Sequence, residues 1–74
     1  MGTVDTNELT TTAKKHGFTV KDLASMLGIT VSSFYRKMKN GGAGFTIEDA
    51  DTICAGCKFD VAEAMRIFFP RYVA

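Results

Sequence analysis

Four helix-start signals are the strongest constraint on how this chain can fold. Each is a Thr or Asp placed directly after a large apolar residue and three residues before a polar or acidic one. The cap oxygen accepts a hydrogen bond from a free backbone N–H, and the residue three positions on can bond back to the cap. The pairs are Thr19 with Asp22, Thr30 with Ser33 (the weaker one), Thr46 with Asp49, and Asp60 with Glu63. The chain is therefore expected to be a string of short helices.

Helix-stop signals follow at matching distances. Gly17, Gly28 and the pair Asn40-Gly41 can adopt the left-handed conformation that ends a helix, and Pro70 cannot continue one. Alternation with period two, the mark of a strand, is hardly seen. Starts and stops together predict helices over residues 5–16, 20–27, 31–39, 47–56 and 61–69. We expect a single all-α domain of five helices spanning residues 1–74.

Length and composition bound the class of protein. With 74 residues the chain is near the lower limit for folding on its own core, and 46% hydrophobic residues are enough to form one. The N-terminus is polar and carries Asp5 where a signal peptide would be basic. No apolar run approaches the roughly 20 residues of a membrane span. These features predict a soluble, cytoplasmic protein that does not bind a membrane.

Charge is distributed unevenly along the chain. Residues 1–44 hold six basic and three acidic side chains, whereas residues 45–74 hold three basic and five acidic ones. No acid lies between Asp22 and Glu48, and three basic residues cluster at positions 36–39. The first half is therefore expected to carry a face that attracts anions.

The segment 19–41 combines two short helices with a tight break at Gly28. Leu23 and Leu27 are four residues apart on the first helix, and Phe34 and Met38 are four apart on the second, so each pair predicts a buried side. The outward residues of the second helix are then hydroxyls, an aromatic and cations: Ser32, Ser33, Tyr35, Arg36, Lys37 and Lys39. Such a set suits the major groove of DNA. Val31 either packs inward or offers its methyls to a thymine.

This segment resembles a known DNA-binding motif. Leu23-Ala24, Leu27-Gly28-Ile29-Thr30 and the run from Ser32 to Arg36 are similar to the helix-turn-helix of the phage Cro and repressor (XRE-type) regulators. The resemblance implies a lambda-repressor-like fold, with 31–39 as the recognition helix and the start of helix 20–27 at the phosphates. Gly44-Phe45-Thr46 and Ile67-Phe68-Phe69 resemble segments of small phage regulatory proteins.

Two positions depart from that family. Lys37 occupies a position that is usually apolar, and Val20 one that is often Gln. The run from Phe34 to Lys39 resembles instead the helix-turn-helix of the Fis and sigma-54-activator type.

The predicted function is sequence-specific regulation of transcription through a double-stranded DNA operator, as in a phage or prophage repressor. The residues expected to read bases are Ser32, Ser33, Tyr35 and Arg36. Those expected at the DNA backbone are Lys21, Thr30, Lys37, Lys39 and Asn40. The alternative function is a protein-interaction module, such as an antirepressor or antitoxin-like partner, that uses the helix-turn-helix as a scaffold.

Catalytic and metal chemistry have little support in the sequence. Cys54 and Cys57 fall late in a predicted helix, whereas a redox pair needs a cysteine at a helix start. With His16 they supply three ligands from two helices, and a structural zinc needs four. No catalytic triad or carboxylate pair is assembled by spacing. We therefore expect core cysteines, no cofactor, no metal and no enzyme activity.

The C-terminal helix is apolar on more than one side. Val61, Ala64, Met65 and Phe68 recur at helical spacing and are predicted to lie in the core. Ile67, Phe69, Tyr72 and Val73 fall off that stripe and leave more apolar surface than a small monomer buries easily. We interpret these four residues as a homodimer contact, with packing inside the monomer as the alternative.

Overall fold

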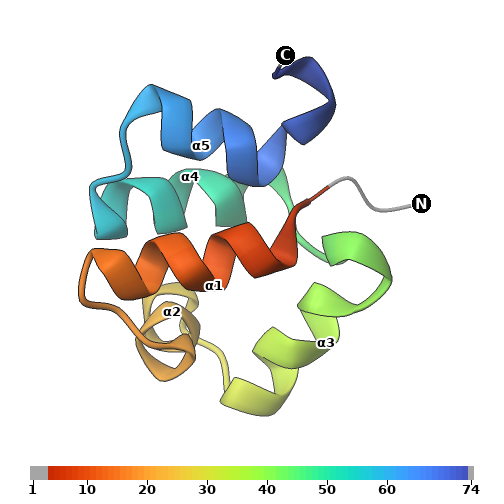
Figure 1. The fold of residues 1–74 in the computed structure, drawn as a ribbon. Coiled ribbons are helices and arrows are strands. Elements are labelled where there is room, and N and C mark those ends of the chain that lie inside the picture. Colours follow the sequence, from red (N-terminus) through yellow and green to blue (C-terminus); the bar gives the residue numbers. More distant parts are fainter. Residues whose placement is uncertain (1–3, 74) are drawn as a thin grey trace.

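A computed structural model describes residues 4–73 of the chain. These residues form five α-helices and a short 3-10 helix (Figure 1). Their bounds are α1 (Thr6–Lys15), α2 (Val20–Leu27), α3 (Val31–Gly42), α4 (Ile47–Cys57), α5 (Val61–Phe68) and η1 (Pro70–Tyr72). Between residues 4 and 73 there is no strand, which confirms the all-α prediction with five helices. Four of the five predicted helix starts are met to the residue.

The helix starts follow from local capping. Thr19, Thr46 and Asp60 each form a complete capping box with the acidic residue three positions on. Thr30 caps α3 from one side only, because its hydroxyl accepts from the N–H of Ser33 and Ser has no carboxylate to bond back. Asp5, which had not been recognised as a cap, accepts from the N–H of Glu8 at 3.0 Å and starts α1.

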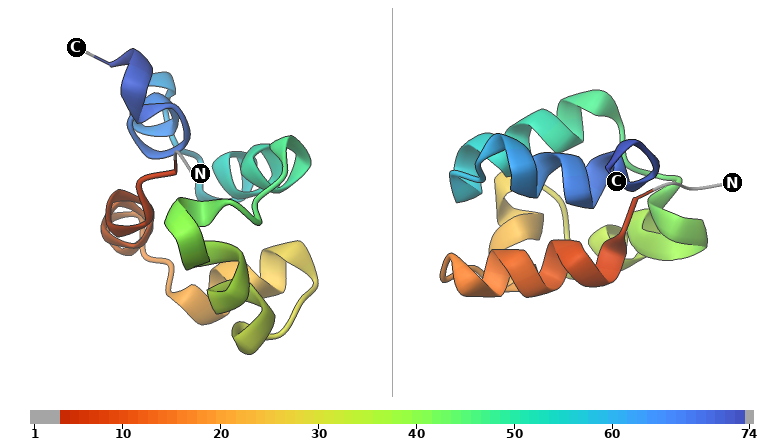
Figure 2. Two further views of the ribbon diagram at one scale, coloured as in Figure 1. Left: turned by 90° about the vertical axis from the view of Figure 1, so that its right-hand side faces the viewer. Right: turned by 45° about the horizontal axis from the view of Figure 1, so that its top comes forward.

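One residue from each helix meets at the centre of the molecule. These side chains are 0% exposed: Leu9, Leu23, Phe34, Ile53 and Ile67, from α1 to α5 in order. Phe45, in the loop before α4, extends this core through edge-to-face contacts with Phe34 (5.4 Å) and Phe68 (6.3 Å). The helices therefore form a bundle around one core, with α2 and α3 below α1 and α5 (Figures 1 and 2). No helix of the described residues is long and apolar enough to cross a membrane.

The end of α3 departs from regular helical geometry. Lys39 is extended (ψ 156°), and Asn40 and Gly41 are left-handed (φ 55° and 66°), so the regular part ends at Met38, close to the predicted stop. The N-terminal segment closes over this end. The N–H of Val4 donates to the carbonyl of Gly41 at 2.9 Å, and the N–H of Asp5 donates to the carbonyl of Ile67 at 2.7 Å.

The rotation of α5 differs from the sequence prediction at two positions. Val61, expected in the core, is 80% exposed, and Ile67, expected on a dimer surface, is fully buried. The prediction was wrong because apolar residues surround this helix, so two rotations bury similar stripes. The backbone bond from Asp5 to Ile67 accompanies the rotation that turns Ile67 toward α1.

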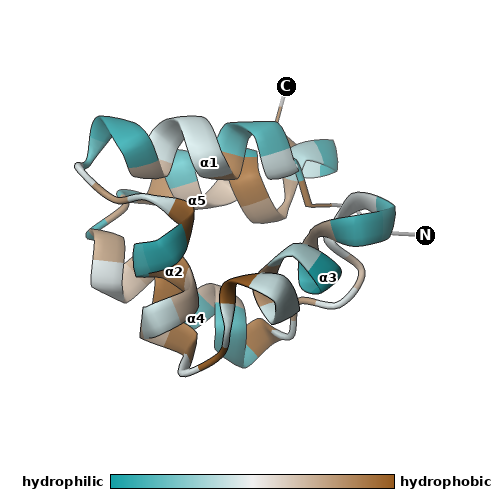
Figure 3. Cartoon of the chain, turned by 90° about the horizontal axis from the view of Figure 1, so that it is seen from below, coloured by the Kyte–Doolittle hydropathy of each residue, from teal (hydrophilic) through white to brown (hydrophobic). Residues whose placement is uncertain are grey.

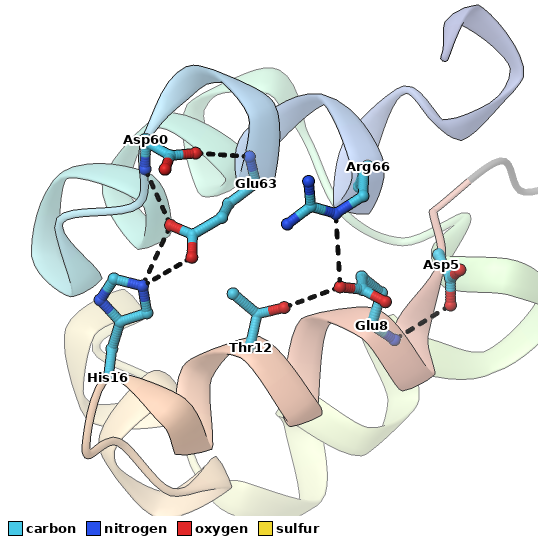
Figure 4. A network of polar contacts seen from close by, with 7 residues as sticks. All are labelled: Asp5, Glu8, Thr12, His16, Asp60, Glu63 and Arg66. Atoms are coloured by element: carbon cyan, nitrogen blue, oxygen red, sulfur yellow. Dashed lines mark hydrogen bonds and ion pairs between the residues drawn. The ribbon is translucent and has the colours of Figure 1, made fainter. Parts of the chain in front are cut away.

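A polar network joins α1 to α5 (Figure 4). Glu8 accepts a hydrogen bond from the Thr12 hydroxyl at 3.0 Å and lies 3.6 Å from the Arg66 guanidinium. At the other end, Nε2 of His16 lies 3.0 Å from each carboxylate oxygen of Glu63. His16 is also the residue that ends α1, as its position in the sequence suggested. These contacts fix the helix that precedes the helix-turn-helix against the last one.

Candidate nucleic-acid interface

A tight turn of three residues connects α2 to α3. Gly28 adopts the left-handed conformation (φ 70°, ψ 30°), and its N–H bonds to the carbonyls of the last turn of α2. The N–H of Ile29 donates to the carbonyl of Ala24 at 3.0 Å, and Thr30 then caps α3. This is a helix-turn-helix, as the sequence predicted, and local backbone and capping bonds form its turn.

The exposed residues in the regular part of α3 form one stripe along the helix. Their spacing repeats every three to four residues, and none is acidic: Val31, Ser32, Tyr35 and Arg36. Lys39, Asn40 and Gly41 are also exposed, but they belong to the irregular end of α3. Three of the four predicted base-reading residues lie in this stripe, namely Ser32, Tyr35 and Arg36. The core residue Phe34 lies on another side of α3 and is fully buried. In the view from below, α3 carries both hydrophilic and hydrophobic segments (Figure 3). The chemistry of the stripe matches what base edges and phosphates require.

Ser33, the fourth predicted base-reading residue, lies beside the stripe and is half-buried. Its Oγ accepts hydrogen bonds from the Thr30 hydroxyl at 3.0 Å and from Nη2 of Arg36 at 3.3 Å. This chain of bonds ties the Arg36 guanidinium to the capped first turn of α3. Ser33 therefore orients Arg36, a role that the sequence alone did not indicate.

Lys37, predicted at the DNA backbone, is engaged inside the chain. Its Nζ lies 2.8 Å from Oδ2 of Asp49 and 3.3 Å from the carbonyl of Gly44. Partial burial raises the pKa of the Asp49 carboxyl, but hydrogen bonds from Lys37 and the Thr46 backbone outweigh it and hold that pKa below its usual value. The ion pair links the recognition helix to the start of α4. A phosphate contact by Lys37 would have to compete with it.

The other predicted backbone residues lie exposed on the elements of the motif. Lys21 is in the first turn of α2, Thr30 caps α3, and Lys39 and Asn40 stand at its far end. Two further exposed cations, Lys14 and Lys15, end α1 immediately before this motif. Their signal in the sequence is the excess of basic over acidic residues in residues 1–44.

A family comparison decides the class of this motif. The model described as "Bacterial regulatory protein, Fis family" matches residues 1–40, more than half of the chain, which covers α1, α2 and the regular part of α3. The chain belongs to the Fis family of bacterial regulatory proteins. No curated protein and no solved structure matches it.

The match agrees with one of the two resemblances in the sequence, to the Fis type of helix-turn-helix. It does not test the other, to the phage Cro and repressor (XRE-type) regulators. The run from Phe34 to Lys39 had suggested the Fis type of helix-turn-helix, and the match covers it. This Fis-family protein is thus a helix-turn-helix regulator that binds DNA. Fis-family regulators are typically not enzymes.

The cysteines of this Fis-family protein are core residues. Cys57 is buried and Cys54 is half-buried, and both are free thiols. Burial raises the pKa of the Cys54 thiol, and it raises that of Cys57 to about 11, so both stay protonated at neutral pH. His16, the third residue considered as a ligand, bonds to Glu63 instead. Among residues 4–73, no group of three His, Cys, Asp or Glu side chains is placed to hold a metal ion.

Proposed function

We propose that this protein is a sequence-specific repressor of the small phage type, which reads a short palindromic operator in the cytoplasm through α3. The observation that carries the proposal is the stripe of four exposed, non-acidic residues on the second helix of the motif, followed by the exposed Lys39 and Asn40. The arrangement of one helix before the motif and two after it also supports the phage repressor type. In this proposal the chain is one DNA-binding domain over residues 1–74.

The proposed roles divide the stripe and its neighbours in two. Ser32, Ser33, Tyr35 and Arg36 read bases, with Arg36 suited to a bidentate contact with guanine. Lys21, Thr30, Lys37, Lys39 and Asn40 contact phosphates, which fixes the register of α3 in the groove. Lys37 does so after exchanging Asp49 for a phosphate oxygen.

The test is selection of bound sequences from a random pool of duplexes, followed by titration of the selected duplex at several salt concentrations. An enriched motif with a steep dependence on salt is expected, and Arg36→Ala should bind the selected duplex more weakly and lose the preference at one base pair. Arg66→Ala is the matched control, because Arg66 is an exposed arginine of α5 whose contact, with Glu8, lies outside both the helix-turn-helix and the apolar face described below. If no sequence is enriched, or if both variants lose binding equally, the proposed reading by α3 is wrong.

We also propose that the repressor binds as a homodimer through an apolar face of α4, α5 and η1. The exposed large apolar side chains there are Ile47, Val61, Phe69, Tyr72 and Val73. Two of them, Ile47 and Phe69, line a hollow of about 220 Å³ together with residues of α4 and α5 that include Ala50, Cys54 and Phe68. Ile67, which the sequence assigned to the dimer contact, is not part of this face because it is buried. The symmetry of the selected motif reports the dimer on DNA.

Sedimentation tests the dimer directly. We expect a dimer at high micromolar concentration that dissociates in Tyr72→Ser, whereas Tyr35→Ser, a matched change on α3, leaves it intact. A monodisperse monomer of the unmodified chain would remove the dimer. The same apolar face is what favours the second candidate function, an antirepressor or antitoxin-like interaction module. Specific retention of a protein partner with no DNA binding at low salt would select that function.

A further inference from the structure

One member of the α3 stripe has a chemistry that the proposed contacts do not use. Val31, the first residue of α3, is 39% exposed, and it belongs neither to the buried core nor to the apolar residues packed against it. A β-branched residue brings no advantage to the first turn of a helix, and the cap of α3 is supplied by Thr30, not by Val31. Packing inside the chain therefore does not account for Val31.

The apolar face proposed for the dimer does not account for it either. The exposed apolar residues of that face belong to α4, α5, η1 and the residue after it, whereas α3 begins on the opposite side of the molecule from α5 and η1 (Figure 2). Tyr35, one turn further along the stripe, is the other exposed large apolar side chain of α3. Val31 thus lies among polar residues, next to Ser32 and one turn before Tyr35.

The major groove offers one apolar group to such a side chain. Base edges there present hydrogen-bond donors and acceptors, except for the 5-methyl group of thymine, which a 5-methylcytosine also carries. We infer that Val31 packs against the 5-methyl group of a pyrimidine and so fixes one base of the operator. This inference rests on the proposed function, because it needs α3 in the groove. The contact would add one base that is recognised by an apolar contact to the bases that are recognised by hydrogen bonds.

The test removes the methyl group from the DNA and its partner from the protein. Each thymine of the selected duplex is replaced in turn by deoxyuridine, which lacks only the 5-methyl group, and the dissociation constant is measured for the unmodified chain and for Val31→Ala. At one thymine in each half-site we expect roughly fourfold weaker binding by the unmodified chain, the equivalent of about 0.8 kcal/mol for one buried carbon. Val31→Ala should lose most of that difference.

Thr11→Ala is the matched control. Thr11 is also an exposed β-branched residue of a helix, but it belongs to α1. It should keep the full penalty for deoxyuridine. At the same position, cytosine and 5-methylcytosine are compared. Tighter binding of the methylated base would show that either pyrimidine methyl is recognised, and equal binding would restrict recognition to thymine.

The outcomes separate the two proposals. If the unmodified chain binds no duplex, the proposed function fails and this inference fails with it. If it binds a defined sequence but no thymine shows a penalty that depends on Val31, the inference alone is overturned. Circular dichroism of Val31→Ala verifies that the helices are intact, as expected for replacement of an exposed valine by a good helix former.

Discussion

Nε2 of His16 lies 3.0 Å from both carboxylate oxygens of Glu63, and the two residues are 47 positions apart in the chain. The pair connects the end of α1 to the first turn of α5 (Figure 4). Phe59 packs edge-to-face against the His16 ring at 5.2 Å, which holds the ring in place. Glu63 also accepts from the N–H of Asp60 at 2.9 Å. A single carboxylate thus caps one helix and ties it to another.

This arrangement predicts a loss of stability in acid. Hydrogen bonds from His16 and from the Asp60 backbone lower the pKa of Glu63 from its usual 4.5. Its contribution is therefore present above about pH 4.5 and is lost as the pH falls through the lowered value. Denaturant unfolding across this range should show a shallower pH dependence in Glu63→Gln. Glu48→Gln, which changes an acid in the first turn of α4, should keep the original slope.

Lys37 and Lys39 are expected to differ in what they support. Lys37→Met should lower the free energy of unfolding by about 1 kcal/mol, because it removes a half-buried ion pair and leaves Asp49 without its cation. Lys39→Met should leave stability unchanged. A double-mutant cycle with Asp49→Asn measures the pair, and additivity of the two changes would mean that Lys37 and Asp49 do not interact in solution.

Arg36 and Lys39 are expected to differ in how they affect DNA binding. Arg36→Ala should cost about 1–3 kcal/mol of binding and relax specificity at one base pair. Lys39→Ala should weaken all sequences about equally and reduce the salt slope by about 1. Titration of both variants against a set of operator mutants distinguishes these patterns. Identical patterns would contradict the division between base-reading and phosphate-contacting residues.

Two glycines test the closure of the N-terminal segment over α3. Both Gly28 and Gly42 have positive φ, so alanine at either position should cost about 1–2 kcal/mol in backbone strain. A Cβ on Gly28 meets nothing within 4 Å, whereas one on Gly42 would lie 2.6 Å from Cβ of Val4. Gly42→Ala should therefore be the more destabilising by at least about 1 kcal/mol. Equal unfolding temperatures of the two variants would show that Val4 moves away from the new methyl group at little cost.

The thiols should be slow to react in the folded chain. Both cysteines have raised pKa values and Cys57 is 1% exposed, so a thiol reagent near neutral pH should modify them far more slowly than in denaturant. Cys57→Ser should lower the free energy of unfolding by about 1–3 kcal/mol, because it buries a hydroxyl group in the apolar core without a compensating hydrogen bond. Fast modification of the native chain would contradict the assignment of the cysteines to the core.

The sequence predicted those features that depend on neighbouring residues. Caps such as Thr19 and Thr46 act within three residues, so the starts of α2 and α4 could be read directly. The helix-turn-helix at Gly28 is local for the same reason. Partners of long polar side chains could not be read, because the Lys37–Asp49 and His16–Glu63 contacts depend on how whole helices pack.

The candidate site follows the same division. The stripe through Tyr35 and Arg36 follows from helical periodicity once Phe34 is placed inside. The ion pair between Lys37 and Asp49, by contrast, depends on the position of α4. The hydrogen bond from Arg36 to Ser33 depends on the side-chain conformation of Arg36, which the sequence does not specify. Val31 stayed open in the sequence, since a valine at a helix start is compatible with burial and with exposure.

The two backbone bonds made by the N-terminal segment give the chain a built-in reporter of cooperativity. The amide hydrogen of Val4 is held by the end of α3, and the next one, of Asp5, is held by the end of α5. Their exchange with deuterated water therefore requires release from two different helices by one short peptide. Equal exchange rates would mean that the segment is released from both helices in one step, and a faster rate at Val4 would mean that its contact with the end of α3 is released before its contact with α5.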